Sequence, residues 1–425
     1  MGLVNVLVFP AEGMNALELH DALSTCVNIK LFGATSVERH AKYVFKNLIT
    51  DVPNIGNQDF IEKFNTIIKE NNIDLIFPTH DTVALYLVEH AKCIKAKVIS
   101  GDLKTVEVCR SKAKTYSLFR GESFIPIQYL NSEKLSFPLF MKPDDGQGAV
   151  GARLIETFED LDGIDWDSYV LTEYLPGKEY TVDCFTDFKG NLRYISPRSR
   201  SRLMAGISVA GESVEVVPEV EYIAKTINSR LNFLGLWYFQ LKEDKDGHLK
   251  LLEISSRCAG TMCQTRAKGI NLPLLSVYTA LGNDVTIFDN KYKVQMDRAL
   301  IGRYFIDYYY ETVYIDFDDT ITLNKGVNLN VVKFLYQCKN FGKSVILLTR
   351  HANDIDESLS QYALSKNLFD KIIHINNEDL KSKYIDPNNA IFIDNAYKER
   401  EDVAKVHSIP VFDVDGIEFL LDWRI

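Results

Sequence analysis

Carboxylates gather directly after an apolar run near the C-terminus of this 425-residue sequence. Residues 316–320 read DFDDT and follow TVYI at 312–315. Because strand residues alternate between two faces, Asp316 and Asp318 are expected on one face at the strand's carboxyl end, where ligands bind open α/β sheets. Two neighbouring carboxylates repel each other unless a cation or proton separates them. The pattern favours Mg²⁺-assisted phosphoryl transfer, with Asp316 as nucleophile and Asp318 as the acid that protonates the leaving group.

Glycines and a lysine indicate a second phosphate site earlier in the chain. Residues 145–151 read DGQGAVG, and Lys142 precedes them. Gly146 and Gly148 let backbone N–H groups approach phosphate oxygens, and the lysine adds a point charge. The string fits G-x-G-x-x-G, but RLIE at 153–156 is strand-like where a dinucleotide-binding fingerprint requires a helix. We therefore predict a flexible phosphate-binding loop between two strands; a surface hairpin is the alternative.

Gln240 and Glu253 are the candidate metal ligands of the same region. They lie in two strand-like runs joined by the turn KEDKDG at 242–247, so their side chains can converge. Mg²⁺ prefers oxygen ligands and usually binds through one or two carboxylates plus nucleotide phosphates. A buried glutamate without a partner is costly, which favours a ligand role for Glu253 over an exposed strand carboxylate. The hydroxyl of Ser255 is a weaker candidate ligand, direct or through water.

Arginines alternate with other residues in PRSRSR at 197–202. A period of two would place Arg198, Arg200 and Arg202 on one face of a strand, and Arg257 and Arg266 follow in the sequence. A guanidinium pairs bidentately with carboxylate or phosphate, so the cluster could orient an acid substrate and stabilise an acyl-phosphate transition state. The alternative is a solvated basic strand.

Composition limits the class of protein. Hydrophobic residues make up 46% and charged residues 25%, which is typical of a soluble globular protein, and the length predicts two to four domains. With 48 basic and 58 acidic residues the net charge is −10, which argues against nucleic acid as the main partner but not against small anions. The seven cysteines form no C-x-x-C pair, so we expect reduced thiols in a cytoplasmic protein. No apolar run is long enough to predict a membrane span.

Three blocks must position these residues. Residues 1–105 alternate apolar runs (4–9, 28–33 and 73–78) with a helix-like stretch at 59–70, which predicts a parallel, doubly wound α/β sheet. Residues 106–305 are richer in glycine and in strand-like runs closed by turns, which indicates an α+β domain. In residues 312–425, five strand-like runs alternate with amphipathic helices, which predicts a second parallel α/β domain. There, Asn328 and Gly342 are expected to be the N-cap and C′ residues of a helix at 329–341.

The order of motifs in residues 1–305 resembles the ATP-grasp superfamily, particularly its carbamoyl-phosphate-synthetase-like and carboxylate–amine ligase branches. The resemblance rests on CRSKAKTYSLF (109–119), FPLFMKPDDGQGAVG (137–151), YVLTEYLPGKEYTVDCF (169–185) and GLWYFQLKEDKDGHLKLLEISSRCAG (235–260). It implies a pre-ATP-grasp α/β subdomain at 1–105 and an ATP-grasp α+β domain at 106–305.

The resemblance also implies cofactors and roles. ATP would bind with Mg²⁺, or Mn²⁺. The implied phosphate ligands are Lys112 and Lys142 with Gly146 and Gly148. The implied adenine ligands are Glu173, Tyr174 and Leu175, and the implied ribose ligand is Glu179. The implied metal ligands are Gln240, Glu253 and Ser255. The family usually has Asn-Pro-Arg after the glutamate, whereas this chain has Ser-Ser-Arg ending at Arg257. The implied reaction joins a carboxylate and an amine through an acyl phosphate, with Arg198 and Arg257 as catalytic candidates.

Residues 312–425 are similar to the haloacid-dehalogenase (HAD) phosphatase superfamily. DFDDT matches its first motif, and three further motifs follow in order at strand ends. The resemblance implies a Rossmann-like domain without a large cap. The implied residues are Thr349 as phosphate-binding hydroxyl; Lys381, or alternatively Lys383, as charge-balancing lysine; Asp394 with Asp316 and Asp318 as Mg²⁺ ligands; Asn395 beside them; and Glu399 or Asp402 as partners. An inactive relic is the alternative.

Together these patterns predict a bifunctional enzyme, an ATP-dependent ligase joined to a phosphatase. Its partners would be a small-molecule carboxylate, an amine and a phosphorylated compound, with neither nucleic acid nor membrane; the oligomeric state is left open. A small-molecule kinase fused to a phosphatase is one alternative. A nucleotide-binding regulatory module with an active phosphatase domain is another.

Overall fold

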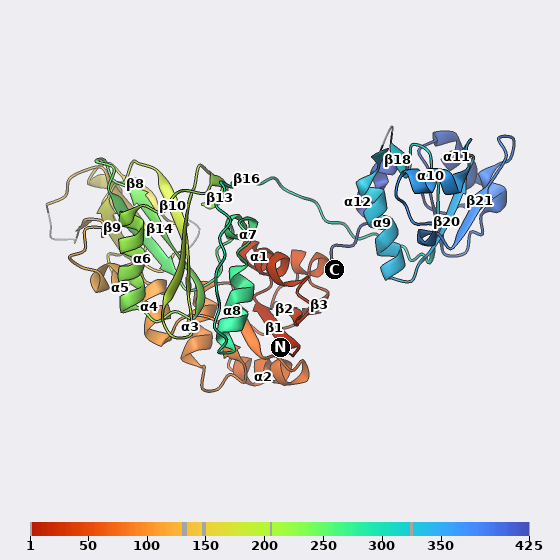
Figure 1. The fold of residues 1–425 in the computed structure, drawn as a ribbon. Helices are drawn as coiled ribbons and strands as arrows, with labels where there is room; N and C mark the ends of the chain where they lie inside the picture. The colour runs from red at the N-terminus through yellow and green to blue at the C-terminus, as the bar shows by residue number, and fades with distance from the viewer. Residues whose placement is uncertain (1, 130–133, 147–149, 205, 324–325, 425) are drawn as a thin grey trace. The chain divides into compact units, whose positions relative to one another are not determined.

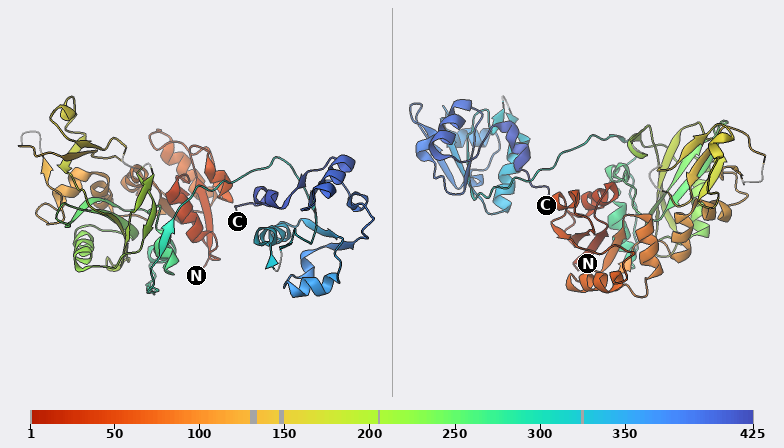
Figure 2. Two further views of the ribbon diagram at one scale, coloured as in Figure 1. Left: turned by 90° about the horizontal axis from the view of Figure 1, so that it is seen from above. Right: turned by 180° about the vertical axis from the view of Figure 1, so that it is seen from behind.

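The computed structural model describes residues 2–129, 134–146, 150–204, 206–323 and 326–424. The chain divides into two compact units, of which the first ends at Leu300 and the second comprises Ile301–Arg424 (Figure 1). Figure 2 shows both units in two further views. Within the described ranges, no helix is both long enough and apolar enough to cross a membrane.

The first unit begins with a parallel sheet in the order β3-β2-β1-β4-β5. Its elements are β1 (Val4–Phe9), α1 (Met14–Leu23), β2 (Ile29–Ala34), η1 (His40–Tyr43), β3 (Asn47–Ile49), α2 (Phe60–Glu70), β4 (Leu75–Pro78), α3 (Asp81–Glu89) and β5 (Lys97–Val98). Both faces of β1 are buried: Val6 packs in the core that contains α1, and Leu7 packs in the core with Phe60 and Phe64 of α2. Burial on both faces explains why this strand is a continuous apolar run.

The remainder of the first unit contains three sheets, ordered β6-β9-β7-β8, β11-β10-β14-β15 and β12-β13-β16. All three are antiparallel throughout. The elements are α4 (Leu103–Arg110), α5 (Lys112–Leu118), β6 (Gln128–Tyr129), β7 (Leu139–Pro143), β8 (Arg153–Ile155), η2 (Glu159–Leu161), β9 (Tyr169–Glu173), β10 (Glu179–Thr186), β11 (Leu192–Ser199), β12 (Arg202–Met204), β13 (Ile207–Glu212), α6 (Pro218–Arg230), β14 (Gly235–Glu243), β15 (Leu249–Ser255), α7 (Cys263–Ala267), α8 (Leu272–Ala280) and β16 (Gln295–Asp297).

Strand β14 has one face in a hydrophobic core and the other toward a cavity. Trp237 and Phe239 pack with Ile223 and Ile227 of α6. The alternate residues Tyr238, Gln240 and Lys242 line the cavity described below. This alternation follows from the two-residue period of a strand, so packing of the aromatic residues against α6 fixes the direction of the polar ones.

The second unit contains a parallel sheet in the order β21-β20-β17-β22-β23. Its elements are β17 (Thr312–Ile315), β18 (Thr322–Leu323), β19 (Gly326–Val327), α9 (Leu329–Asn340), β20 (Ser344–Thr349), α10 (Ile355–Gln361), η3 (Lys366–Leu368), β21 (Lys371–His374), η4 (Lys381–Tyr384), β22 (Ala390–Ile393), α11 (Tyr397–His407), β23 (Val411–Phe412), η5 (Val414–Gly416) and α12 (Ile417–Leu420). Separate hydrophobic cores cover the two faces of the sheet.

The ends of α9 follow the sequence expectation. Asn328 is the N-cap, and its side-chain oxygen accepts a hydrogen bond from the backbone N–H of Asn330 at 3.1 Å. Gly342 has φ +68°, a conformation that favours glycine after a helix. The helix itself ends at Asn340, one residue before the expected end.

Candidate functional sites

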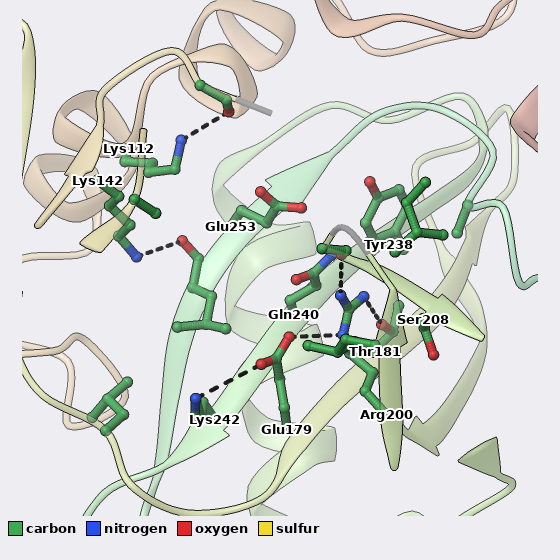
Figure 3. Close-up of a pocket in the computed structure, with 18 of the residues that line it drawn as sticks. Lys112, Lys142, Glu179, Thr181, Arg200, Ser208, Tyr238, Gln240, Lys242 and Glu253 are labelled. Atoms are coloured by element: carbon green, nitrogen blue, oxygen red, sulfur yellow. Dashed lines mark hydrogen bonds and ion pairs between the residues drawn. The ribbon is translucent and has the colours of Figure 1, made fainter. Parts of the chain in front are cut away.

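The first unit encloses a cavity of about 580 Å³, within the size range of small-molecule sites (Figure 3). Strands of all three antiparallel sheets contribute to its walls. The predicted residues that line it are Lys112, Lys142, Gly146, Glu173, Tyr174, Leu175, Glu179, Arg198, Gln240, Glu253 and Arg257. Gly148 lies outside the described residues. Ser255 lies outside this lining and lines a smaller cavity together with Glu253.

Two lysines stand at one side of the cavity (Figure 3). Lys112, at the start of α5, donates to the carbonyl oxygens of Pro143, Asp144 and Gly146 at 3.0, 3.1 and 3.1 Å. It thereby holds the first part of the predicted phosphate-binding loop. Burial lowers the pKa of Lys112, although the carboxylate of Glu253 opposes this shift.

Lys142, on β7, has few compensating partners. Its Nζ is 3.4 Å from the carbonyl oxygen of Leu252 and 5.2 Å from the ring centre of Tyr116. Burial, reinforced by the charge of Lys112, lowers the pKa of Lys142 to about 7, while Glu253 acts in the opposite direction. An anionic ligand placed here would favour the protonated form.

The predicted adenine-binding residues lie at the end of β9 and directly after it. The carboxylate of Glu173 accepts a hydrogen bond from the backbone N–H of Ile127 at 2.9 Å. Leu175 is buried, whereas Tyr174 is exposed. All three line the cavity, which gives this region an apolar wall beside a fixed carboxylate.

Glu179, the predicted ribose ligand, is already held by two cations. Its carboxylate is 2.7 Å from Nε of Arg200 and 3.9 Å from Nζ of Lys242 (Figure 3). Arg200 also donates to the carbonyl oxygen of Gly206 at 3.0 Å, so it ties β10 to the segment between β12 and β13. A ribose hydroxyl would therefore share Glu179 with Arg200.

Gln240 and Glu253 are directly opposite each other in the β14–β15 pair. Opposed residues on antiparallel strands point to the same side, and both side chains line the cavity. A carboxylate and an amide oxygen that face the same cavity fit the preference of Mg²⁺ for oxygen ligands, with nucleotide phosphates completing the shell. Gln240 and Glu253 are therefore the residues that would hold the metal.

Ser255 is directed to another carboxylate. Its hydroxyl donates to Asp81 Oδ1 at 2.7 Å, and Arg257 donates to Asp81 Oδ2 at 2.8 Å. Burial would raise the pKa of Asp81, but the charge of Arg257 and the hydrogen bonds from Arg257 and Ser255 outweigh it, and the pKa is lowered. The hydroxyl proton of Ser255 is therefore engaged with Asp81, and Ser255 lines a smaller cavity together with Glu253 and Lys112.

The arginines do not form the single face that the period of two predicts. Strand β11 ends at Ser199, so the alternation stops before Arg200. Each guanidinium instead has its own acidic partner, which is Asp183 for Arg198, Glu179 for Arg200, Asp297 for Arg202 and Glu18 for Arg266. Only Arg198, Arg200 and Arg257 line the cavity among the arginines of the described ranges. Within those ranges, Nη2 of the buried Arg198 has no hydrogen-bond partner, which leaves it for an anionic ligand.

Two acids of this site were not predicted. Asp81 follows the apolar run that forms β4, at the edge of a parallel sheet where ligands usually bind. Asp183 interrupts the apolar stretch of β10, is completely buried and also accepts a hydrogen bond from Thr265 at 2.8 Å. A charged residue inside an apolar strand was the available signal, because such a residue requires a buried partner.

In the second unit, Lys381 lies between two of the predicted carboxylates. Its Nζ is 2.6 Å from both Asp316 Oδ1 and Asp394 Oδ2, and all three side chains are buried. Burial raises the pKa of Asp316 to about 6, with Lys381 opposing the shift and Asp394 adding to it. Lys383, the alternative lysine, is exposed.

The remaining predicted residues of the second unit surround this trio. Thr349, at the end of β20, is completely buried, and its hydroxyl accepts a hydrogen bond from the backbone N–H of His351 at 3.1 Å. The side chain of Asp318 is half-exposed and lies 2.9 Å from Nδ1 of His351. Asn395 contacts the hydroxyl of Thr320 through its backbone N–H at 3.1 Å. Glu399 pairs with Arg350 at 2.6 Å.

Two of the predicted Mg²⁺ ligands of the second unit share one lysine, and the third has a different partner. Across the described residues, the acidic and histidine side chains close enough to share a metal are Asp244, Asp246 and His248, in the exposed β14–β15 turn. Asp316 and Asp394 face Lys381, and Asp318 faces His351. A cation that used all three carboxylates would have to draw Asp318 away from His351.

Comparison with known proteins agrees with the nucleotide-binding part of this description. Residues 165–299 match the sequence model of a family described as ATP-grasp in the biosynthetic pathway with Ter operon. This match covers less than half of the chain. Among curated proteins, no sequence match was found.

Several solved structures share the fold. The biotin carboxylase domain of 2-oxoglutarate carboxylase from Hydrogenobacter thermophilus, solved with MgADP, ADP and bicarbonate, is 16% identical over 68% of this chain and 72% of its own, with a TM-score of 0.56. N5-carboxyaminoimidazole synthetase from Staphylococcus aureus, in complex with ADP, is 13% identical over 68% of this chain and 81% of its own, with a TM-score of 0.57. L-amino acid ligase from Bacillus licheniformis is 16% identical over 66% of this chain and 75% of its own, with a TM-score of 0.53.

These matches locate the likeness in the sequence and in the fold. The sequence match lies around β10, β14 and β15, the strands that carry Glu179, Gln240 and Glu253. The structural matches extend over about two thirds of the chain. Residues 165–299 thus match an ATP-grasp family, and about two thirds of the chain share a mixed α/β fold with a biotin carboxylase domain and an amino acid ligase.

Proposed function

We propose that the first unit is an ATP-dependent carboxylate–amine ligase. The observation that carries the proposal is the placement of Gln240 and Glu253 in the same cavity as two lysines, the half-buried Lys112 and the buried Lys142. Oxygen ligands for Mg²⁺ together with cations for phosphate are the groups that a bound nucleoside triphosphate requires. The fold shared with an amino acid ligase and an ADP-binding synthetase supports this choice.

The proposed reaction has two steps. An oxygen of the substrate carboxylate attacks the γ-phosphorus of ATP, the bond to ADP breaks, and an acyl phosphate forms. The amine nitrogen then attacks the acyl carbon, phosphate leaves, and the nitrogen loses a proton as the amide forms. Bound at Gln240 and Glu253, Mg²⁺ would neutralise charge on the triphosphate.

The residues of the cavity divide this work. Lys112 and Lys142 compensate the developing phosphate charge, while Arg257 and the unpartnered Nη2 of Arg198 are placed to orient the carboxylate. Arg257 is itself fixed by Asp81, so its position does not depend on substrate. Catalysis then consists mainly of positioning and charge neutralisation.

The test is an ATP-consumption screen across pairs of acids and amines, read by mass spectrometry. A ligase forms an amide and ADP only when both substrates are present. Glu253→Gln should abolish turnover, and the exposed Glu215→Gln should leave it unchanged. A stable phosphorylated acid or alcohol formed without amine would instead support the kinase alternative. ATP turnover that survives Glu253→Gln would contradict the proposed site.

We also propose that the second unit is a HAD-type phosphatase with Asp316 as nucleophile. The observation that favours it is the 2.6 Å contact of Lys381 with both Asp316 and Asp394 at the carboxyl edge of a parallel sheet. A lysine in this position would balance the charge of an aspartyl phosphate. Release of phosphate from phosphate monoesters, lost in Asp316→Asn, is the test.

The presence of both units in one chain suggests that they act on successive compounds. A phosphatase could act on a substrate or product of the ligation. If Asp316→Asn leaves the final product of the coupled reaction unchanged, the two sites do not act in sequence.

A further inference from the structure

His351 joins two of the residues on which the proposed phosphatase depends. Its Nδ1 lies 2.9 and 3.0 Å from the two carboxylate oxygens of Asp318. Its backbone N–H donates to the hydroxyl oxygen of Thr349 at 3.1 Å. One residue therefore contacts both the predicted acid and the predicted phosphate-binding hydroxyl.

The imidazole is held on its other edge as well. Nε2 is 2.7 Å from the hydroxyl of Ser358 on α10, and the ring meets Phe317 edge to face at 5.0 Å between centroids. The carbonyl oxygen of His351 is 2.5 Å from Nε2 of His374. Ring and backbone are thus restrained from three sides, and the side chain is 9% exposed.

The contact with Asp318 has a clear direction when that carboxyl group is ionised. An ionised carboxylate only accepts, so Nδ1 of His351 then donates to it. Nε2 is in hydrogen-bond contact with the Ser358 hydroxyl. The row of carboxylate, imidazole and hydroxyl resembles a hydrolytic triad, but Ser358 is 7% exposed and closes the row inside the protein, whereas Asp318 is its open end.

We propose that His351 is a positioning residue that holds Asp318 in place for proton transfer in the second unit. The proposal rests on the phosphatase function proposed above. Without this contact, Asp318 is a half-exposed side chain that would sample several rotamers. A fixed donor N–H shared by the two oxygens holds the carboxyl group in one orientation, and the exposed side of that group stays open to the leaving group or water.

The proposed chemistry is balanced in two steps. Asp316 attacks phosphorus, the bond to the leaving oxygen breaks, and protonated Asp318 gives that oxygen its proton. Water then attacks phosphorus, Asp318 takes a proton from it, and the bond to Asp316 breaks to release phosphate. His351 keeps its own protons throughout and only orients Asp318.

Leaving-group dependence tests this role. An alkyl phosphate, such as glycerol phosphate, needs a proton on its leaving oxygen, whereas p-nitrophenolate leaves without one. His351→Ala in the full chain should lower kcat for the alkyl ester by about 10²-fold, the usual contribution of acid catalysis, and for p-nitrophenyl phosphate by less than about tenfold. KM should change little for either ester, because His351 does not contact the substrate.

Two conservative variants are the matched controls. In His351→Asn the amide nitrogen can take the position of Nδ1 and should restore most of the alkyl-ester rate. In His351→Gln the amide lies nearer the position of Nε2, toward Ser358, and should restore less. Circular dichroism and thermal unfolding of each variant identify any change of fold.

The outcomes separate the two proposals. Equal losses with both esters, or no loss with either, would show that His351 has no part in proton transfer while the phosphatase stands. Wild-type protein that hydrolyses neither ester would overturn the phosphatase and the role of His351 together.

Discussion

The two candidate sites of this chain treat buried charge in opposite ways. In the first unit, Lys142 is buried beside a second cation, and its Nζ lies 3.4 Å from the carbonyl oxygen of Leu252. In the second unit, the buried lysine Lys381 lies 2.6 Å from two carboxylates. Lys142 has no close carboxylate partner among the described residues and is suited to receive an anion with a ligand, whereas Lys381 is neutralised by two carboxylates and is suited to hold a nucleophile in position.

Loss of the proposed nucleophile should have the largest effect, because it should abolish the activity of one site and leave the other site active. Asp316→Asn in the full chain is expected to lower phosphate-ester hydrolysis by about 10⁴-fold or more, because an amide cannot form the covalent intermediate. Ligase turnover should be unaffected. The neighbouring Asp319→Asn is the matched control, since Asp319 is exposed and its φ of +55° suits asparagine. Full hydrolysis in Asp316→Asn would remove Asp316 from the mechanism.

Removal of the internal cation should destabilise the second unit. Lys381→Met leaves Asp316 and Asp394 buried without their shared partner, and losing one member of a buried ion pair costs about 3–5 kcal/mol. Urea unfolding followed by a probe in the second unit measures this loss. The exposed Lys383→Met is the control and should change the free energy of unfolding by less than about 0.5 kcal/mol. Similar losses in both variants would contradict the central place of Lys381.

The raised pKa of Asp316 predicts how stability depends on pH. Its pKa in the folded protein is about 6, above the usual 3.8, so the folded state binds more protons than the unfolded state between these values. Its contribution to stability is complete below about pH 3.8 and is lost as pH rises through 6. Unfolding of wild type and Asp316→Asn across this range gives the contribution as a difference. A difference that does not vary with pH would contradict it.

Lys142 should take up a proton when nucleotide binds. With a pKa of about 7 it is mostly neutral at pH 8, and a triphosphate beside it would favour the charged form. Nucleotide binding at pH 8 should therefore take up approximately one proton, and fewer at pH 6, measured by calorimetry in buffers of different ionisation enthalpy. Lys142→Met should abolish the uptake. Proton release, or uptake unchanged by Lys142→Met, would contradict the prediction.

The smallest effect is expected at Ser255. Since its hydroxyl is engaged with Asp81, Ser255→Ala should change the affinity for the Mn²⁺–nucleotide complex by less than about twofold, measured by electron paramagnetic resonance of Mn²⁺. Glu253→Gln is the positive control, with a loss of about tenfold or more. A comparable loss in Ser255→Ala would place the hydroxyl on the metal after all.

The regular elements were predictable because they follow from periodicity. Alternation placed Gln240 and Glu253 on facing strands, and the apolar run before Asp316 predicted β17. The contacts of Ser255 were not predictable, because Asp81 is 174 residues away in sequence. Nor was the choice between Lys381 and Lys383, since both lie in the short η4 helix and only the packing of that helix decides which one is buried.

The arginines show a second limit. Their spacing predicted one basic face, but this holds only while the strand continues, and β11 ends at Ser199. The guanidinium groups instead form ion pairs with separate acidic residues, as Arg198 does with Asp183. A sequence pattern identifies groups that need partners; long-range packing decides which partners they have.

The hydrophobic cores of the first unit have a consequence for how the cavity opens. The sheet β6-β9-β7-β8 packs around a small core of its own, whereas α1, β1 and β14 share a single core with α8. We therefore expect the sheet that contains β7 and Lys142 to move as a rigid body relative to the strands that carry Gln240 and Glu253. The rate of product release would then be set by the opening motion of this sheet and not by the chemical steps.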